Sequence, residues 1–136
     1  MANGFEILEA SAFIDVIGWN LEEGDNSTML HSCGLRKEIN SSFNQKFRVN
    51  CLVNEVDVDS FDALVVPGGF KNYGYYKDSY NIEFLNLIRE FRSKNKTIAS
   101  VCVGALPLAK SGVLENKNAT TYNQAEYRQS LKNNGV

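Results

Sequence analysis

The 136-residue sequence has one histidine, three cysteines and no long apolar run. No stretch approaches the roughly 18–20 apolar residues of a membrane-spanning helix, so we expect no membrane partner. The formal net charge of −2 lacks the basic excess of nucleic-acid-binding domains, and we expect no nucleic-acid partner either. A hydrophobic content of 43% is ordinary for a globular protein, and this length suggests one domain over residues 1–136.

The three cysteines, Cys33, Cys51 and Cys102, are widely separated and form no C-x-x-C pair. Their spacing matches no zinc site, so we expect no metal, and their odd number disfavours a disulfide framework. Residues 1–4 do not have the character of a signal peptide. We therefore expect a cytoplasmic protein with free thiols, in which Cys33 and Cys51 are small buried apolar residues.

Short apolar runs alternate with amphipathic segments along the whole chain. Extended segments are expected at residues 28–33, 36–39, 46–53, 61–66, 97–101 and 119–122, helices at 6–20, 82–91, 106–111 and 124–132, and a tyrosine-rich loop at 71–80. Strands that alternate with helices predict an α/β, flavodoxin-like fold: a doubly wound, mainly parallel sheet with helices on both faces.

Cys102 lies where the buried strand predicted at residues 97–101 turns into a helix. A thiol at such a turn is expected to be exposed at the positive end of the helix, which favours the reactive thiolate. Gly104, two positions later, would let the turn close, as in a nucleophile elbow. The sequence therefore predicts a reactive cysteine.

Pro67-Gly68-Gly69 follows the apolar run at residues 61–66, one strand–helix unit before Cys102. Ligands of parallel sheets bind at the carboxyl ends of strands, so we expect a small-molecule substrate there. The N–H groups of Gly68 and Gly69 are unobstructed by side chains and could stabilise an oxyanion. Taken alone, Pro-Gly-Gly is more typical of a tight structural turn, but its place after an apolar strand and one unit before Cys102 favours a functional role.

Three segments resemble the signature segments of the ThiJ/PfpI superfamily, which includes the parkinsonism-associated deglycase and is related to class I glutamine amidotransferases. They are residues 4–10 (GFEILEA), 61–69 (FDALVVPGG) and 99–105 (ASVCVGA), and residues 111–114 and 119–122 also fit. The resemblance implies a catalytic Cys102 with Glu9 as its acidic partner, no cofactor, and a homodimer. Glu6 is the other candidate acid, but it matches a variable position.

In the arrangement that the resemblance implies, Glu9 keeps its proton and donates a hydrogen bond to the sulfur. Backbone N–H groups near Gly69 and Val103 would hold an oxyanion. From the residues alone, Glu9 is instead expected to be a solvated charge near a helix start.

The chain departs from the superfamily pattern where a catalytic histidine is found. Members that act as peptidases have histidine directly after the cysteine, where this chain has Val103. Others have it at the end of the later short strand, where this chain has Tyr122, a hydrogen-bonding residue but a poor base near neutrality. The single histidine, His31, is expected on a strand away from the elbow. A Cys–His dyad is therefore unsupported.

The superfamily also has a strand before the first signature segment and further elements after the last helix. By this comparison, we expect the domain to be truncated at both ends, without that first strand and those C-terminal elements. The strand at 61–66 would then have an unpaired edge.

Three functions are compatible with these residues. The first is a cysteine-dependent enzyme, glyoxalase- or deglycase-like, that acts on a small carbonyl compound. The second is a redox-responsive protective protein without turnover, in which Cys102 is oxidised to a sulfinate. The third is an intracellular cysteine peptidase or amidase, which Val103 disfavours.

Overall fold

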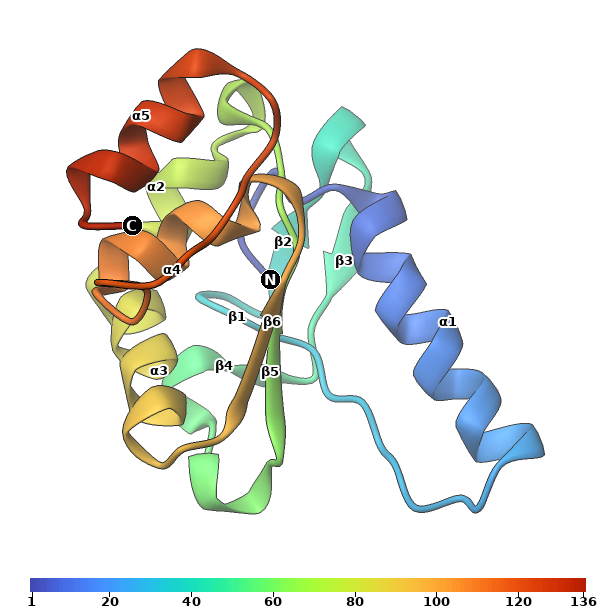
Figure 1. Cartoon of the computed structure of the whole chain (residues 1–136). Coiled ribbons are helices and arrows are strands. Elements are labelled where there is room, and N and C mark those ends of the chain that lie inside the picture. The colour runs from blue at the N-terminus through green and yellow to red at the C-terminus, as the bar shows by residue number, and fades with distance from the viewer.

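The computed structural model describes residues 1–136 and shows an α/β arrangement (Figure 1). The helices are α1 (Ile7–Glu23), α2 (Tyr75–Ser79), α3 (Ile82–Ser93), α4 (Ala105–Ser111) and α5 (Ala125–Asn133). The strands are β1 (Cys33–Gly34), β2 (Glu38–Asn40), β3 (Lys46–Arg48), β4 (Cys51–Leu52), β5 (Ala63–Val66) and β6 (Thr97–Ser100). None of the helices combines the length and apolar character needed to cross a membrane.

The strands associate in pairs, two of them parallel. β5 pairs with β6 and β1 pairs with β4 in parallel, whereas β2 and β3 form an antiparallel hairpin. Helices α3 and α4 lie on one side of β5 and β6, and α1 lies on the other (Figure 1). The predicted flavodoxin-like α/β fold, with parallel strands and helices on both faces, is confirmed.

The main core lies between the β5–β6 pair and helices α3 and α4. Helix α3 begins where the side chain of Asn81 accepts a hydrogen bond from the Glu83 N–H at 2.9 Å. Its apolar residues recur at helical spacing, so one face is buried: Phe84, Leu85, Leu87, Ile88 and Phe91. Burying each such side chain stabilises the fold by about 1.5–3 kcal/mol.

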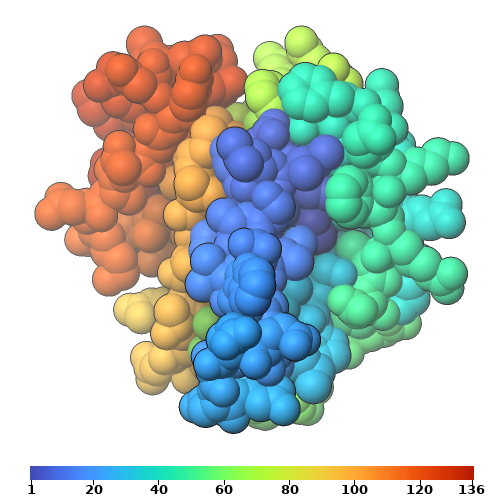
Figure 2. Space-filling model, turned by 90° about the vertical axis from the view of Figure 1, so that its right-hand side faces the viewer, coloured from blue at the N-terminus to red at the C-terminus, as the bar shows by residue number.

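Helix α1 packs differently from α3. The sequence predicts a wide buried face for it, but Ala10 is its only fully buried residue. Leu8, Val16 and Trp19 are 76%, 70% and 59% exposed. Figure 2 shows α1 lying across this face of the molecule. A cavity of about 630 Å³, lined by residues of α1 and β5, takes the place of a packed layer beneath it.

Three local predictions are wrong. Residues 28–32 and 119–122 form no strand, because a strand needs a continuous ladder of backbone hydrogen bonds. In the first segment only Ser32 reaches a neighbour, where its carbonyl accepts from the Asn50 and Cys51 N–H groups. The tyrosine-rich segment is not a plain loop, since it contains α2 and the fully buried Tyr75. The Tyr75 hydroxyl donates to the Pro67 carbonyl at 2.7 Å, so this segment supports the end of β5.

Candidate functional site

Cys102 lies at a sharp turn between β6 and α4. Its φ is +55°, a left-handed conformation that is uncommon for a residue other than glycine, asparagine or aspartate. A Cβ atom at Gly104 would lie 2.3 Å from the carbonyl oxygen of Val66, so no larger residue fits there. The structure thus has the sharp strand-to-helix turn that the sequence predicts, with Gly104 at its tightest point.

Glu9 reaches the elbow from the first turn of α1. The Gly68 N–H donates a hydrogen bond to Glu9 Oε2 at 2.7 Å. A Cβ atom at Gly68 would lie 2.8 Å from that oxygen and 3.0 Å from the Val103 nitrogen. Because Gly68 has no side chain, the Glu9 carboxyl and the Val103 backbone can both approach the end of β5.

The Cys102 thiol is half-buried, and burial is the main reason that its pKa rises to about 11. The Val103 N–H acts in the opposite direction, whereas the nearby Glu9 carboxyl raises the pKa through a hydrogen bond and its charge. This raised pKa disfavours the thiolate that the sequence predicts for Cys102 at rest. Loss of water and a neighbouring carboxylate outweigh the positive end of α4, a helix of seven residues.

Glu6 is the second acid near Cys102, and its charge makes the smallest contribution to the raised Cys102 pKa. Its side chain caps α1 by accepting from the Leu8 N–H, and Oε2 accepts from the Ser42 hydroxyl at 3.0 Å. These local bonds occupy both of its oxygens. The geometry thus brings Glu9, rather than Glu6, to the sulfur.

Two backbone donors at the ends of β5 and β6 remain available. The N–H groups of Gly69 and Val103 donate to no oxygen of the protein. Gly68 differs from them, because its N–H is engaged by Glu9. Gly69 and Val103 therefore keep the backbone donors that the sequence assigns to an oxyanion, whereas Gly68 does not.

Tyr122 and His31 make no hydrogen bond to Cys102 or Glu9. Tyr122 is 53% exposed and makes no hydrogen bond to Cys102. Its neighbour Thr121, which the sequence does not single out, donates from Oγ1 to the Cys102 carbonyl at 3.1 Å. His31 is exposed on residues 28–32, where its Nε2 contacts the Met29 sulfur at 3.0 Å.

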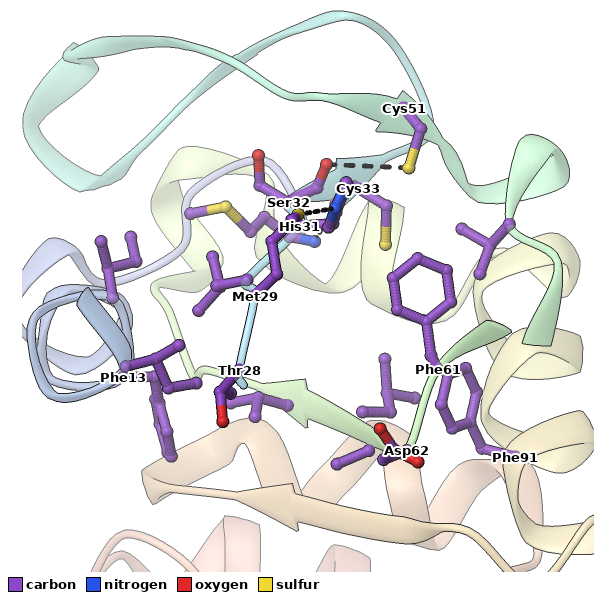
Figure 3. A pocket seen from close by; sticks show the side chains of 18 of the residues that line it. Phe13, Thr28, Met29, His31, Ser32, Cys33, Cys51, Phe61, Asp62 and Phe91 are labelled. Carbon is purple, nitrogen blue, oxygen red and sulfur yellow. Dashed lines mark hydrogen bonds between the residues drawn. The ribbon is translucent and has the colours of Figure 1, made fainter. Parts of the chain in front are cut away.

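The large cavity between α1 and β5 is a separate feature (Figure 3). Its lining is mostly apolar and includes His31, Phe61 and Phe91, but neither Cys102 nor Glu9. No three histidine, cysteine or carboxylate side chains gather closely enough to hold a metal ion. Cys102 and Glu9 thus lie outside this cavity.

Comparison with known proteins places this geometry in context. The sequence model of the DJ-1/PfpI family matches residues 1–136. The chain is 32% identical over 91 residues to uncharacterized protein MJ0967 of Methanocaldococcus jannaschii. This alignment covers 67% of this chain and 43% of that protein. The chain is also 32% identical over 75 residues to deglycase PfpI of Pyrococcus furiosus, in an alignment that covers 55% of this chain and 43% of that protein.

The fold is also similar to solved structures. Drosophila melanogaster DJ-1beta superposes with a TM-score of 0.79 at 24% identity, over 98% of this chain and 67% of that chain. A ThiJ/PfpI domain protein of Brachyspira murdochii superposes with a TM-score of 0.75 at 17% identity, over 98% of this chain and 72% of that chain. The chain spans less than half the length of the two curated relatives.

Proposed function

This chain belongs to the DJ-1/PfpI family, and on that premise we propose that it is a cysteine-dependent, cofactor-free enzyme acting on a small carbonyl compound. One observation carries the proposal: the Glu9 carboxyl is held by the Gly68 N–H beside the Cys102 thiol. Relatives named deglycases, such as PfpI, support a carbonyl substrate.

The proposed first step is addition of the thiol to an aldehyde. The Cys102 sulfur forms a bond to the carbonyl carbon, its proton passes to the Glu9 carboxylate, and the carbonyl π electrons move to oxygen. The N–H groups of Gly69 and Val103 stabilise this oxyanion by hydrogen bonds. Glu9 then returns the proton to the oxygen, which yields a neutral thiohemiacetal.

The raised pKa of Cys102 explains why this chemistry needs Glu9. With a pKa of about 11, only about one thiol in ten thousand is ionised at pH 7. A base that removes the proton as the sulfur attacks avoids this penalty, and such a base typically contributes about 10²–10⁴-fold in rate. Glu9 is the carboxylate in hydrogen-bonding reach of the sulfur.

Turnover of methylglyoxal to lactate tests the proposal. The wild-type protein is expected to form more lactate than its own molar concentration, since free thiols can only bind methylglyoxal stoichiometrically. We expect Cys102→Ser to abolish lactate formation and Glu9→Gln to lower kcat at least 10²-fold. Cys33→Ser is the matched control and should retain activity. Equal turnover by wild type and Cys102→Ser would refute the proposal.

The alternative functions have less support. A pKa of about 11 counts against a peroxide-sensing role for Cys102, because the thiolate is the form that is oxidised. A peptidase would lack a histidine at the elbow, where Val103 follows the cysteine. The same proposal includes a small-molecule substrate and a homodimer. Sedimentation velocity tests whether the chain forms that homodimer.

A further inference from the structure

The two cysteines outside the elbow are direct partners in a strand pair. Cys33 of β1 stands opposite Cys51 of β4 in the parallel register. Neighbouring strands run about 4.7–4.9 Å apart. Disulfides join residues whose Cα atoms are about 4.4–6.8 Å apart, so the ladder already holds these two backbones at a bridging distance.

Both thiols are free and accessible from one cavity. Cys33 and Cys51 are each half-buried and line the cavity between α1 and β5 (Figure 3). The Cys51 thiol makes one long hydrogen bond, to the Ser32 carbonyl at 3.8 Å, which leaves it free to rotate. Burial is the main cause of the raised Cys51 pKa, and the charge of the neighbouring Cys33 adds to it.

We propose that Cys33 and Cys51 form a reversible disulfide on exposure to hydrogen peroxide, at a redox site separate from Cys102. The Cys33 sulfur, as its thiolate, attacks a peroxide oxygen, because the raised pKa of Cys51 disfavours that thiol as the first to react; the O–O bond breaks, the released hydroxide becomes water, and a sulfenic acid remains on Cys33. The second thiol attacks this sulfur, the S–O bond breaks, and another water leaves. Two thiols and one peroxide thus yield one disulfide and two waters.

The bridge would close the segment that contains the β2–β3 hairpin. Residues 33–51 are held at their ends by only two residues in each of β1 and β4. The hairpin connection carries Ser42, whose hydroxyl donates to Glu6 beside the elbow. A covalent link restricts the unfolded chain, so the oxidised protein should melt at a higher temperature. A bridge between directly paired strand residues should also be readily reduced.

Peptide mapping of the peroxide-treated protein under non-reducing conditions tests this inference. Trypsin places Cys33, Cys51 and Cys102 in three separate peptides, residues 1–36, 49–71 and 97–110. We expect peptide 1–36 to be linked to 49–71 with the loss of two hydrogen atoms. The yield should not change on tenfold dilution, because the link is intramolecular, and a thiol reductant should reverse it.

The matched variants separate this site from the elbow. Cys102→Ser should form the same linked peptide, whereas Cys33→Ser and Cys51→Ser should form none. Absence of the link in the wild type, a predominant link to peptide 97–110, or a link only between two chains would overturn the inference. None of these outcomes bears on methylglyoxal turnover, which depends on Cys102.

Discussion

The Gly68 N–H donates to Glu9 Oε2 at 2.7 Å, although the two residues are 59 positions apart. This hydrogen bond joins the first turn of α1 to the end of β5. It holds a carboxyl group at the elbow, where that group raises the pKa of Cys102. The position of the proposed catalytic base thus depends on a glycine that has no chemistry of its own.

Gly68→Ala should separate Glu9 from the elbow. The added Cβ atom would lie 2.8 Å from Glu9 Oε2 and 3.0 Å from the Val103 nitrogen, so one of these groups must move. A displacement of about 1 Å can cost about 10²-fold in rate. We expect kcat for methylglyoxal to fall by this factor, with the near-ultraviolet circular dichroism spectrum retained.

Gly18→Ala is the control for this substitution. A Cβ atom at Gly18 meets no atom within 4 Å, and the residue lies inside α1. Alanine favours a helix interior over glycine by about 0.5–1 kcal/mol, so urea denaturation should show a gain of this size with unchanged kcat. Unchanged activity in Gly68→Ala would contradict the proposed role of Glu9.

The reactivity of Cys102 should depend steeply on pH. Because its pKa is about 11, alkylation by iodoacetamide should accelerate about tenfold per pH unit between pH 7 and 10. The rate is measured by mass spectrometry on peptide 97–110. Glu9→Gln removes a charge that raises this pKa, so its curve should shift to lower pH. A wild-type midpoint below pH 8 would instead support the thiolate that the sequence predicts.

The same pKa shift also affects stability at high pH. The folded state holds the Cys102 proton more tightly than an unfolded chain, in which a thiol has a pKa near 9.0. This contribution to stability is fully present below pH 9 and is lost as the pH rises through about 11. Urea midpoints for wild type should therefore fall more than those for Cys102→Ser over this range.

Two neighbouring cations should differ greatly in their contribution to stability. Arg36 makes two hydrogen bonds of 2.7 Å to Asp78, a carboxylate that is almost fully buried. Arg36→Met removes the cation from this carboxylate, to which the Asn3 N–H still donates, and should cost about 3–5 kcal/mol in urea denaturation. Lys37 pairs with exposed Glu55, so Lys37→Met should cost less than about 1 kcal/mol. Similar losses in the two variants would contradict this assignment.

Thr121 should support the elbow through its side-chain hydroxyl. Thr121→Val keeps the shape but loses the hydrogen bond to the Cys102 carbonyl, which should cost about 0.5–1.5 kcal/mol. We expect kcat to fall several-fold as well, because the strained Cys102 backbone loses a partner. Thr120→Val, at an exposed neighbouring position, should change neither quantity. An equal effect of both substitutions would exclude a specific role for Thr121.

Features that depend on short stretches of chain could be predicted from the sequence. The run of apolar residues before Cys102 and the small residue at Gly104 indicate the elbow, because its geometry is set by adjacent residues. The spacing of apolar residues likewise predicts α3 and its buried face. Residues 28–32 were predicted wrongly, because apolar character alone does not supply the neighbouring strand that a ladder requires.

What the sequence determined by itself is therefore the order of elements and the strained turn that carries Cys102. Tertiary structure decided that the Gly68 N–H holds Glu9, that Thr121 rather than Tyr122 contacts the elbow, and that Cys33 faces Cys51. It also raised the pKa of Cys102, through burial and the nearby Glu9 carboxyl. The physical reason is that hydrogen-bond partners, loss of water and charge proximity depend on residues brought together from distant parts of the chain, which local pattern does not encode.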